Sequence, residues 1–132
     1  MFRPSLRENL VSVYVRTEFD SVLLAWPGVT VEDLWEARIA KVGGKVFALL
    51  SDSAPYRIVF KCGETPFDLL TELDGISQAP YFAKRNWVQV YDGSPLSNDE
   101  LTAYMRRSYA MVAKGLTRKL RAELGVADDL GI

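Results

Sequence analysis

The residue types best suited to binding chemistry stand together between positions 78 and 91, in the stretch QAPYFAKRNWVQVY. Two cations, Lys84 and Arg85, lie there between two aromatic residues, Tyr81 and Trp87. Lysine and arginine contact phosphate groups, and aromatic rings stack on nucleobases, so this combination is typical of nucleic-acid contacts. The stretch therefore supports a first hypothesis, in which the chain is a binding module for nucleic acid.

Two more lysines, Lys41 and Lys45, join this candidate set because they border a predicted hairpin turn. Charge is also unevenly distributed: residues 84–121 hold 8 basic and 3 acidic side chains, a net charge of +5, although the whole chain carries −1. A local basic patch would attract an anionic partner. A solvated helix face explains the same distribution, and the sequence pI of about 5.5 favours that simpler interpretation.

A second hypothesis uses the strand pattern that ends the stretch. Trp87, Gln89 and Tyr91 alternate with two valines, so one strand face carries two large aromatic residues with a glutamine between them. If no helix covers that face, it is an apolar patch with a polar centre, which is a usual mark of a protein or small-ligand site. If a helix covers it, Trp87 belongs to the core.

The sequence contains no histidine, which excludes Ser-His-Asp catalysis, Cys-His catalysis and histidine-based zinc hydrolysis within the chain. The one cysteine, Cys62, excludes an internal disulfide and a multi-cysteine metal site. It alternates with Phe60 on an apolar strand face, where we expect a small buried hydrophobe and not a nucleophile. Carboxylates, lysines and tyrosines stand at no recognisable catalytic spacing, so we expect no enzyme activity and no cofactor.

Three helices are predicted from apolar spacing and from signals at their ends. The first begins after Thr17 as its N-cap, and the second opens at Thr65-Pro66, with the threonine as cap. Ser97 and Glu100 form a capping box that opens the third helix. That helix either runs on past Gly115 or breaks there and restarts.

Strands fill most of the remaining chain. Alternation predicts strands over residues 35–39 and 56–62, and an apolar run predicts a central strand over 46–50. The glycine pair 43–44 predicts a two-residue turn, and residues 29–34 are predicted to be a connection. Strands at hairpin spacing with helices to one side predict an α+β fold, with an antiparallel β-sheet backed by helices.

The length suits one domain spanning residues 1–132. Its core is predicted to cover residues 17–116, preceded by an N-terminal extension over 1–16 and followed by a C-terminal helix or tail over 117–132.

Five segments, spaced in order along the chain, resemble the MmcQ/YjbR family of small bacterial proteins. They are WPGV (26–29), KVGGKVFALL (41–50), IVFKCGETPFDLL (58–70), APYFAKRNWVQV (79–90) and SYAMVAKGL (108–116). Each segment alone is a weak signal, but their order and spacing together are fairly specific, and the resemblance covers residues from about 17 to 116.

The resemblance implies a fold similar to CyaY, the bacterial frataxin: a sandwich of an antiparallel sheet and helices. It also implies a double-wing arrangement that could touch DNA, in line with the first hypothesis. The family pattern usually has histidine before the tryptophan, where this chain has Asn86. An amide still donates and accepts hydrogen bonds, so Asn86 joins the candidate set, without any role that needs an imidazole.

Fold analogy alone suggests a third hypothesis, frataxin-like iron handling. Hard iron sites favour clustered carboxylates. The early part of the chain offers Glu18, Asp20, Glu32 and Asp33, which is a thin supply, so this hypothesis ranks last.

No apolar run approaches the roughly 18 residues of a membrane span, and the first ten residues are too charged for a secretory signal. The expected location is therefore the cytoplasm, without a membrane partner. The expected partners are nucleic acid or another protein, and the sequence does not define an oligomeric state.

Overall fold

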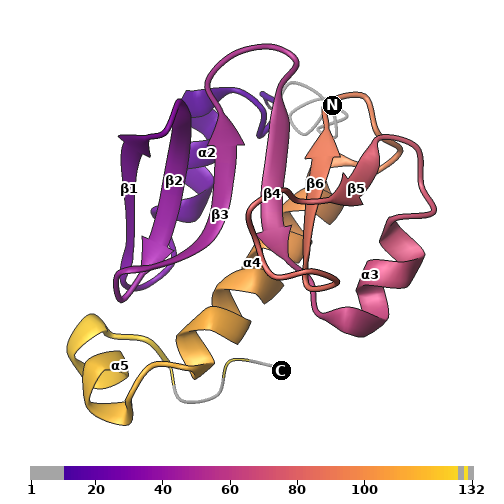
Figure 1. Ribbon diagram of the computed structural model, residues 1–132. Helices are drawn as coiled ribbons and strands as arrows, with labels where there is room; N and C mark the ends of the chain where they lie inside the picture. Colours follow the sequence, from indigo (N-terminus) through magenta and orange to yellow (C-terminus); the bar gives the residue numbers. More distant parts are fainter. Residues whose placement is uncertain (1–10, 128–129, 131–132) are drawn as a thin grey trace, which may run out of the picture.

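Figure 1 shows a computed structural model of the chain, which describes residues 11–127 and 130. A six-stranded antiparallel sheet organises them, with strand order β1-β2-β3-β4-β6-β5. The strands are β1 (Val29–Leu34), β2 (Ala37–Val42), β3 (Lys45–Ser51), β4 (Arg57–Lys61), β5 (Ile76–Gln78) and β6 (Trp87–Tyr91). The helices are α2 (Arg16–Leu23), α3 (Glu64–Leu70), α4 (Asn98–Lys114) and α5 (Arg118–Leu124).

Helices α2 and α4 cover one face of the sheet and lie behind it in Figure 1. Phe19 of α2 and Tyr109 of α4 are buried against that face, where Phe47 and Phe60 come from the strands. The opposite face, here called the open face, carries the loop between β5 and β6, which passes in front of β4 in Figure 1. The predicted fold class, an antiparallel sheet backed by helices, is confirmed.

Several local predictions are also confirmed. Gly43 and Gly44 adopt positive φ angles of 59° and 80° and form the two-residue turn between β2 and β3. Ser97 and Glu100 form the capping box that begins α4. Of the two alternatives left open for the third helix, the structure has the break: α4 ends at Lys114, and α5 restarts after Thr117, whose side chain accepts from the Leu120 N–H.

One strand was missed and its neighbour was misplaced. Residues 29–34, predicted to be a connection, form β1 and pair with β2 in a regular antiparallel register. Trp35, predicted to lie in a strand, occupies with Glu36 the turn that joins β1 to β2. The prediction was wrong because alternation continues through the turn, whereas the polar residues of β1 owe their extended form to pairing with β2.

Two helix starts also differ from prediction. Helix α2 follows Val15, and α3 follows Gly63, and neither cap makes a side-chain hydrogen bond. Thr65-Pro66 therefore lies inside the first turn of α3. The backbone carbonyl of Asn86 accepts from the N–H groups of both Cys62 and Gly63, so a contact distant in sequence positions this helix.

Residues 1–10 of the predicted N-terminal extension lie outside the described residues. Beyond them, Val13 and Tyr14 are buried in the core, and the Tyr14 hydroxyl donates to the Val90 carbonyl at 2.8 Å. None of the four helices in the described residues is long and apolar enough to cross a membrane.

Candidate functional site

A groove with a volume of about 610 Å³ runs over the open face of the sheet. It lies between the β1–β2 turn and the β5–β6 loop, and its walls are mainly apolar. Its lining residues are Trp35, Glu36, Ala37, Ile39, Val46, Leu49, Ser51, Arg57, Val59, Pro80, Tyr81 and Phe82. The volume falls within the range of about 300–1,000 Å³ that is usual for small-molecule sites.

Two exposed aromatic side chains line this groove from different elements. The relative solvent-accessible surface of Trp35 is 77 %, and Tyr81 is fully exposed. Both have left-handed backbones, with φ angles of 56° and 71°. Such a backbone costs an ordinary residue roughly 1–2 kcal/mol, and an exposed ring returns little burial energy to offset it. Burial of the rings therefore does not offset the backbone cost at these two residues.

Polar groups enter the groove from Ser51, Arg57 and Glu36. Ser51 and Ala37 are paired across β2 and β3, and the Ser51 hydroxyl accepts from the Arg57 N–H at 2.9 Å, so these residues meet at one end of the groove. The Nε of Arg57 is buried and has no hydrogen-bond partner among the described residues. The residue as a whole is half-buried and lines the groove, so a ligand acceptor there could meet its guanidinium.

Trp87, named in both binding hypotheses, is buried under the β5–β6 loop and not under a helix. Its ring stacks on Phe82 with centroids 4.4 Å apart, and it packs with Val59 and Ala79 in a small second core. Gln89 on the same strand donates from its side chain to the Ser77 hydroxyl at 3.1 Å. The accessible part of the open face thus lies over β2, β3 and β4, while the face of β6 is partly covered.

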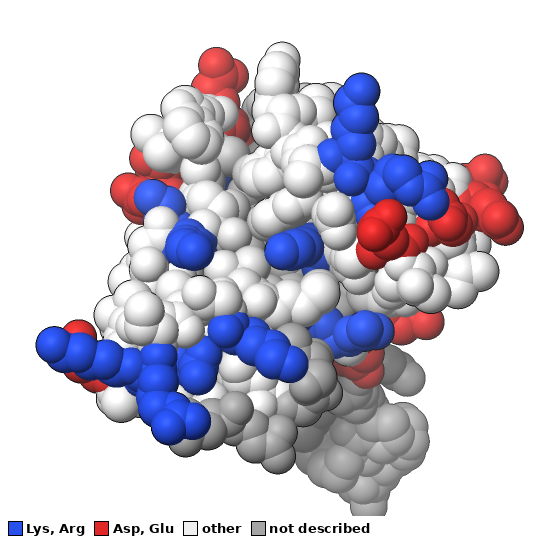
Figure 2. Space-filling model, turned by 60° about the horizontal axis from the view of Figure 1, so that its bottom comes forward, with Lys and Arg blue, Asp and Glu red and all other residues white. Residues whose placement is uncertain are grey.

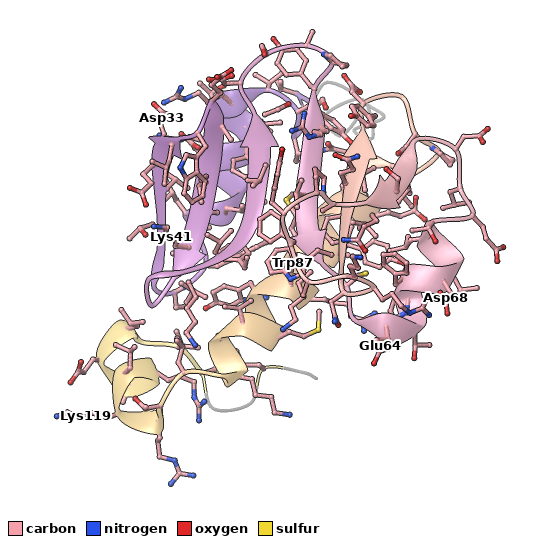
Figure 3. The ribbon with its side chains drawn as sticks, viewed as in Figure 1. Asp33, Lys41, Glu64, Asp68, Trp87 and Lys119 are labelled. Atoms are coloured by element: carbon pink, nitrogen blue, oxygen red, sulfur yellow. The ribbon has the colours of Figure 1, made fainter. Side chains whose placement is uncertain are left out.

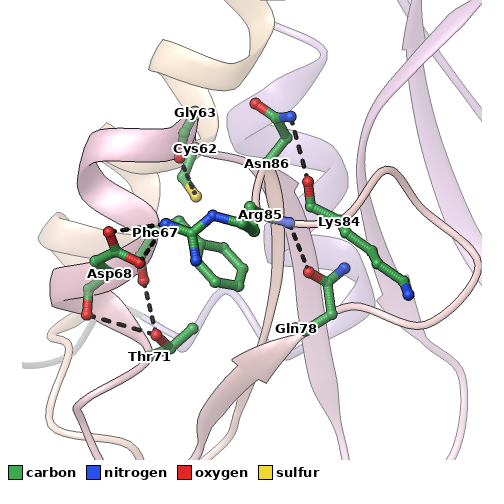
Figure 4. A network of polar contacts seen from close by, with 9 residues as sticks. All are labelled: Cys62, Gly63, Phe67, Asp68, Thr71, Gln78, Lys84, Arg85 and Asn86. Atoms are coloured by element: carbon green, nitrogen blue, oxygen red, sulfur yellow. Dashed lines mark hydrogen bonds and ion pairs between the residues drawn. The ribbon is translucent and has the colours of Figure 1, made fainter.

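The basic turn over residues 84–86, at the end of the β5–β6 loop, is held by contacts within the chain (Figure 4). Arg85 forms an ion pair with Asp68 of α3 at 2.9 Å, and its guanidinium lies 5.5 Å from the centre of the Phe67 ring. The side chain of Asn86 donates to the carbonyl of Lys84, at 3.5 Å. Arg85 and Asn86 therefore make contacts that stabilise this turn. Lys84 is exposed and is the cation of the turn best placed to meet a partner.

Lys41 lies apart from Trp87, the residue that follows this turn (Figure 3). Lys41 is paired with Glu32 of β1 at 2.6 Å, and Lys45 is exposed at the start of β3. Strands β3 and β4 separate Lys41 from Trp87, which places their backbones about 14 Å apart at the usual strand spacing. The structure does not gather the seven sequence-predicted residues into one compact surface.

Basic side chains gather instead along the end of the molecule where α5 and the end of α4 lie (Figure 2). The exposed cations of these two helices are Arg106, Arg107, Lys114, Arg118 and Lys119. Two arginines of the region serve the fold. Arg106 lies 4.6 Å from the centre of the Tyr109 ring, and Arg121 donates to the carbonyls of Lys114 and Leu116, which close α4.

Of the four acidic residues behind the iron hypothesis, Asp20 and Asp33 are engaged by arginine and Glu32 by Lys41. Arg38 donates to Asp20 at 2.8 Å and reaches Asp33, which Arg16 also binds at 2.7 Å. The hydrogen bond from Arg16 is the main reason that the pKa of Asp33 is lowered. Within residues 11–127, no three cysteine or acidic side chains lie together as a metal ion would require.

Cys62 is buried, as the sequence predicted. Burial raises the pKa of its thiol to about 11, although a nearby backbone hydrogen bond and Arg107 act in the opposite direction. A thiol with such a pKa carries almost no thiolate at neutral pH and is a poor nucleophile.

Sequence reasoning found Tyr81 but missed Trp35, Glu36 and Arg57. A two-residue hairpin turn is usually predicted from an Asn-Gly or Asp-Gly pair. The β1–β2 turn has Trp35-Glu36 instead, which does not predict a turn. Arg57 reads as an ordinary polar position in an alternating strand. Its place in the groove follows from the neighbouring strand and from the β5–β6 loop, which no local pattern reveals.

Comparison with known proteins places this geometry in context. Residues 24–111 match the family model described as YjbR. The crystal structure of protein DR2400 from Deinococcus radiodurans, which carries the family-model domain DUF419, is similar: the TM-score is 0.76 at 25 % identity, over 85 % of this chain and 88 % of that one. A protein from Pseudomonas syringae shares the fold at 18 % identity and a TM-score of 0.62, over 74 % of this chain and 97 % of that one. None of the curated proteins matches the chain.

Proposed function

The chain belongs to the YjbR family, and we propose that it is a binding module without catalytic chemistry that holds an apolar ligand on the open face of its sheet. The ligand site is the groove between the β1–β2 turn and the β5–β6 loop. Ile39, Leu49 and Val59 form its floor, and Trp35 and Tyr81 are its exposed aromatic walls.

One observation carries this proposal: two large aromatic side chains stand exposed at the same groove on strained backbone. Amphipathic aromatic residues of this kind supply much of the contact energy at ligand and protein interfaces. Their rings can close over an apolar group laid on the strands, and the removal of that apolar surface from water drives binding.

The absence of catalysis is part of the proposal and rests on chemistry in the sequence. The chain has no histidine to act as a general base near neutral pH, and its one thiol is held protonated by burial. Any turnover of a small molecule by the purified protein would contradict this part of the proposal.

An NMR titration with an uncharged apolar probe, 2-naphthalenemethanol, tests ligand binding. We expect saturable shifts of backbone amides in β2, β3, β4 and the 79–86 loop. Tyr81→Ser should weaken binding, because it removes one aromatic wall. Tyr56→Ser is the matched control, since Tyr56 is also an exposed tyrosine but does not line the groove.

Shifts that do not saturate, or that fall mainly on α2, α4 and α5, would contradict the groove as the ligand site. Equal loss of affinity in the Tyr56 and Tyr81 variants would do the same, because the effect would then not come from the groove.

Nucleic acid is the second candidate partner, and the basic side chains that gather at the α4–α5 end support a contact there (Figure 2). Cations on one surface can neutralise several phosphates at once. Lys114, Arg118 and Lys119 are exposed and close in sequence, and the hairpin lysine Lys45 is a further exposed cation.

Electrophoretic mobility of duplex and single-stranded DNA at about 50 mM and 200 mM salt tests this candidate, because phosphate contacts weaken steeply as salt rises. A triple variant, Lys114→Gln, Arg118→Gln and Lys119→Gln, should abolish a shift seen with the wild type. Lys84→Gln alone should leave it nearly unchanged. No shift at the lower salt concentration would eliminate DNA as a partner.

A further inference from the structure

Arg57 gives the groove a second kind of recognition beyond its apolar walls. Its Nε is buried and has no hydrogen-bond partner among residues 11–127 and 130, and no ion pair of its guanidinium is found there. Three other arginines of the described chain, Arg16, Arg38 and Arg85, are paired with aspartates. Arg121 also has a buried Nε without a partner, but its Nη1 donates to the carbonyls of Lys114 and Leu116.

The surroundings of Arg57 hold its backbone in place while leaving the Nε of its side chain without a partner among the described residues. Its N–H donates to the Ser51 hydroxyl, and β4 is a central strand between β3 and β6. Cross-strand pairing places Tyr91 beside it. A guanidinium offers five donors in a flat fork that matches the two oxygens of a carboxylate, so an anionic ligand group would satisfy it.

We infer that the groove takes a small amphipathic anion: a flat apolar body that lies on Leu49 and Val59, with one carboxylate group at Arg57. This inference rests on the proposed function and names the chemical class of its ligand. The volume of about 610 Å³ suits a small molecule of this type.

Glu36 also lines the same end of the groove, and its charge opposes an anion. Its carboxylate belongs to an exposed residue, so water screens it strongly. Arg57 is half-buried, so its charge is screened less than that of Glu36 and decides the sign of the preferred ligand.

Two probes with the same bicyclic ring distinguish binding of an apolar ligand in the groove from a preference for a carboxylate at Arg57. They are 2-naphthoate, which carries a carboxylate, and 2-naphthalenemethanol, which is uncharged. Calorimetric titration should give an affinity for 2-naphthoate about ten-fold higher or more, the range expected for a charge-assisted hydrogen bond.

Arg57→Gln should remove this preference, lowering the affinity for 2-naphthoate about ten-fold while changing that for 2-naphthalenemethanol by less than about two-fold. Arg57→Lys, which keeps the charge but loses the fork, should retain part of it. Lys61→Gln is the matched control: Lys61 is a cation on the same strand, four residues on, that does not line the groove. This variant should keep the full preference.

The outcomes are distinct. If both probes bind the wild type equally, the inference about the anion fails while the apolar ligand site stands. If neither probe binds, both the inference and the proposed function fail. If Lys61→Gln loses the preference as much as Arg57→Gln, the preference comes from general positive charge and not from the Arg57 site. Thermal unfolding of each variant shows whether a lost affinity reflects lost structure.

Discussion

At the scale of single residues, the features that distinguish this protein are three side chains whose positions carry a local energetic cost. Trp35 and Tyr81 keep large rings in water on a backbone that favours glycine or asparagine. Arg57 buries a donor and leaves it unpaired among the described residues. All three line one groove, so the local costs coincide in space.

Replacing Trp35 by asparagine tests whether the ring is kept for binding. Asparagine tolerates the left-handed turn better, so Trp35→Asn should leave stability unchanged or raise it by up to about 1 kcal/mol. The same variant should bind 2-naphthalenemethanol more weakly, and Trp35→Phe should bind it nearly as well as the wild type. Urea unfolding and the NMR titration measure the two effects. A loss of more than about 1 kcal/mol in Trp35→Asn would assign the ring to the fold.

The raised pKa of Cys62 predicts a specific dependence of stability on pH. An unfolded thiol ionises near pH 8.5, whereas the folded one does so at about 11. Between these values the unfolded state binds fewer protons, so the stabilising contribution of Cys62 is complete below about pH 8.5 and is lost as pH rises toward 11.

Urea unfolding at several pH values from 8 to 11 measures this contribution. The free energy of unfolding of the wild type should fall more steeply than that of Cys62→Ala, in which the titrating group is absent. Parallel curves for the two proteins would show that the thiol titrates alike in both states.

At the scale of elements, α4 does more than cover the sheet. Strands β3 and β4 pair directly at only three positions, residues 48–50 with residues 58–60. Next to these pairs, Ser108 of α4 bridges the two strands: its hydroxyl donates to the Phe47 carbonyl at 2.6 Å and accepts from the Lys61 N–H at 2.9 Å. Tyr109 donates to the Pro27 carbonyl at 2.6 Å and so connects α4 to the turn after α2.

Ser108→Ala should destabilise the protein by about 1–3 kcal/mol, because it leaves a buried carbonyl and an N–H without partners. Ser21→Ala, on the exposed side of α2, is the control and should change stability by less than about 0.5 kcal/mol. Thermal or urea unfolding measures both. A neutral Ser108→Ala would mean that water or a shift of the strands replaces the bridge.

The elements also show what sequence reasoning can and cannot reach. The glycine turn at 43–44 and the capping box of Ser97 were predictable, because their residues fold locally. Strand β1 and the start of α3 were not, because pairing with β2 and the Asn86 carbonyl determine them. The same limit applies to the site: exposed Tyr81 stood in a visible motif, but its meeting with Arg57 depends on the β5–β6 loop crossing β4.

At the scale of the whole molecule, the sheet divides the protein into two unlike sides. One side is filled by α2 and α4 and forms the main core, and the other is left to a loop and a groove (Figure 1). The exposed cations gather on neither of these sides but at the end of the molecule where α5 lies (Figure 2). A scaffold of this kind positions a binding surface without committing a helix to it, which fits a module that holds a ligand.

Intermolecular nuclear Overhauser effects between 2-naphthoate and the protein test the central claim most directly. The account predicts effects from the naphthyl protons to the methyl groups of Ile39, Leu49 and Val59 and to the ring of Tyr81. Effects confined to methyl groups of the α2–α4 side or to α5, or none at a saturating probe concentration, would contradict the claim that the open face of the sheet is the ligand site.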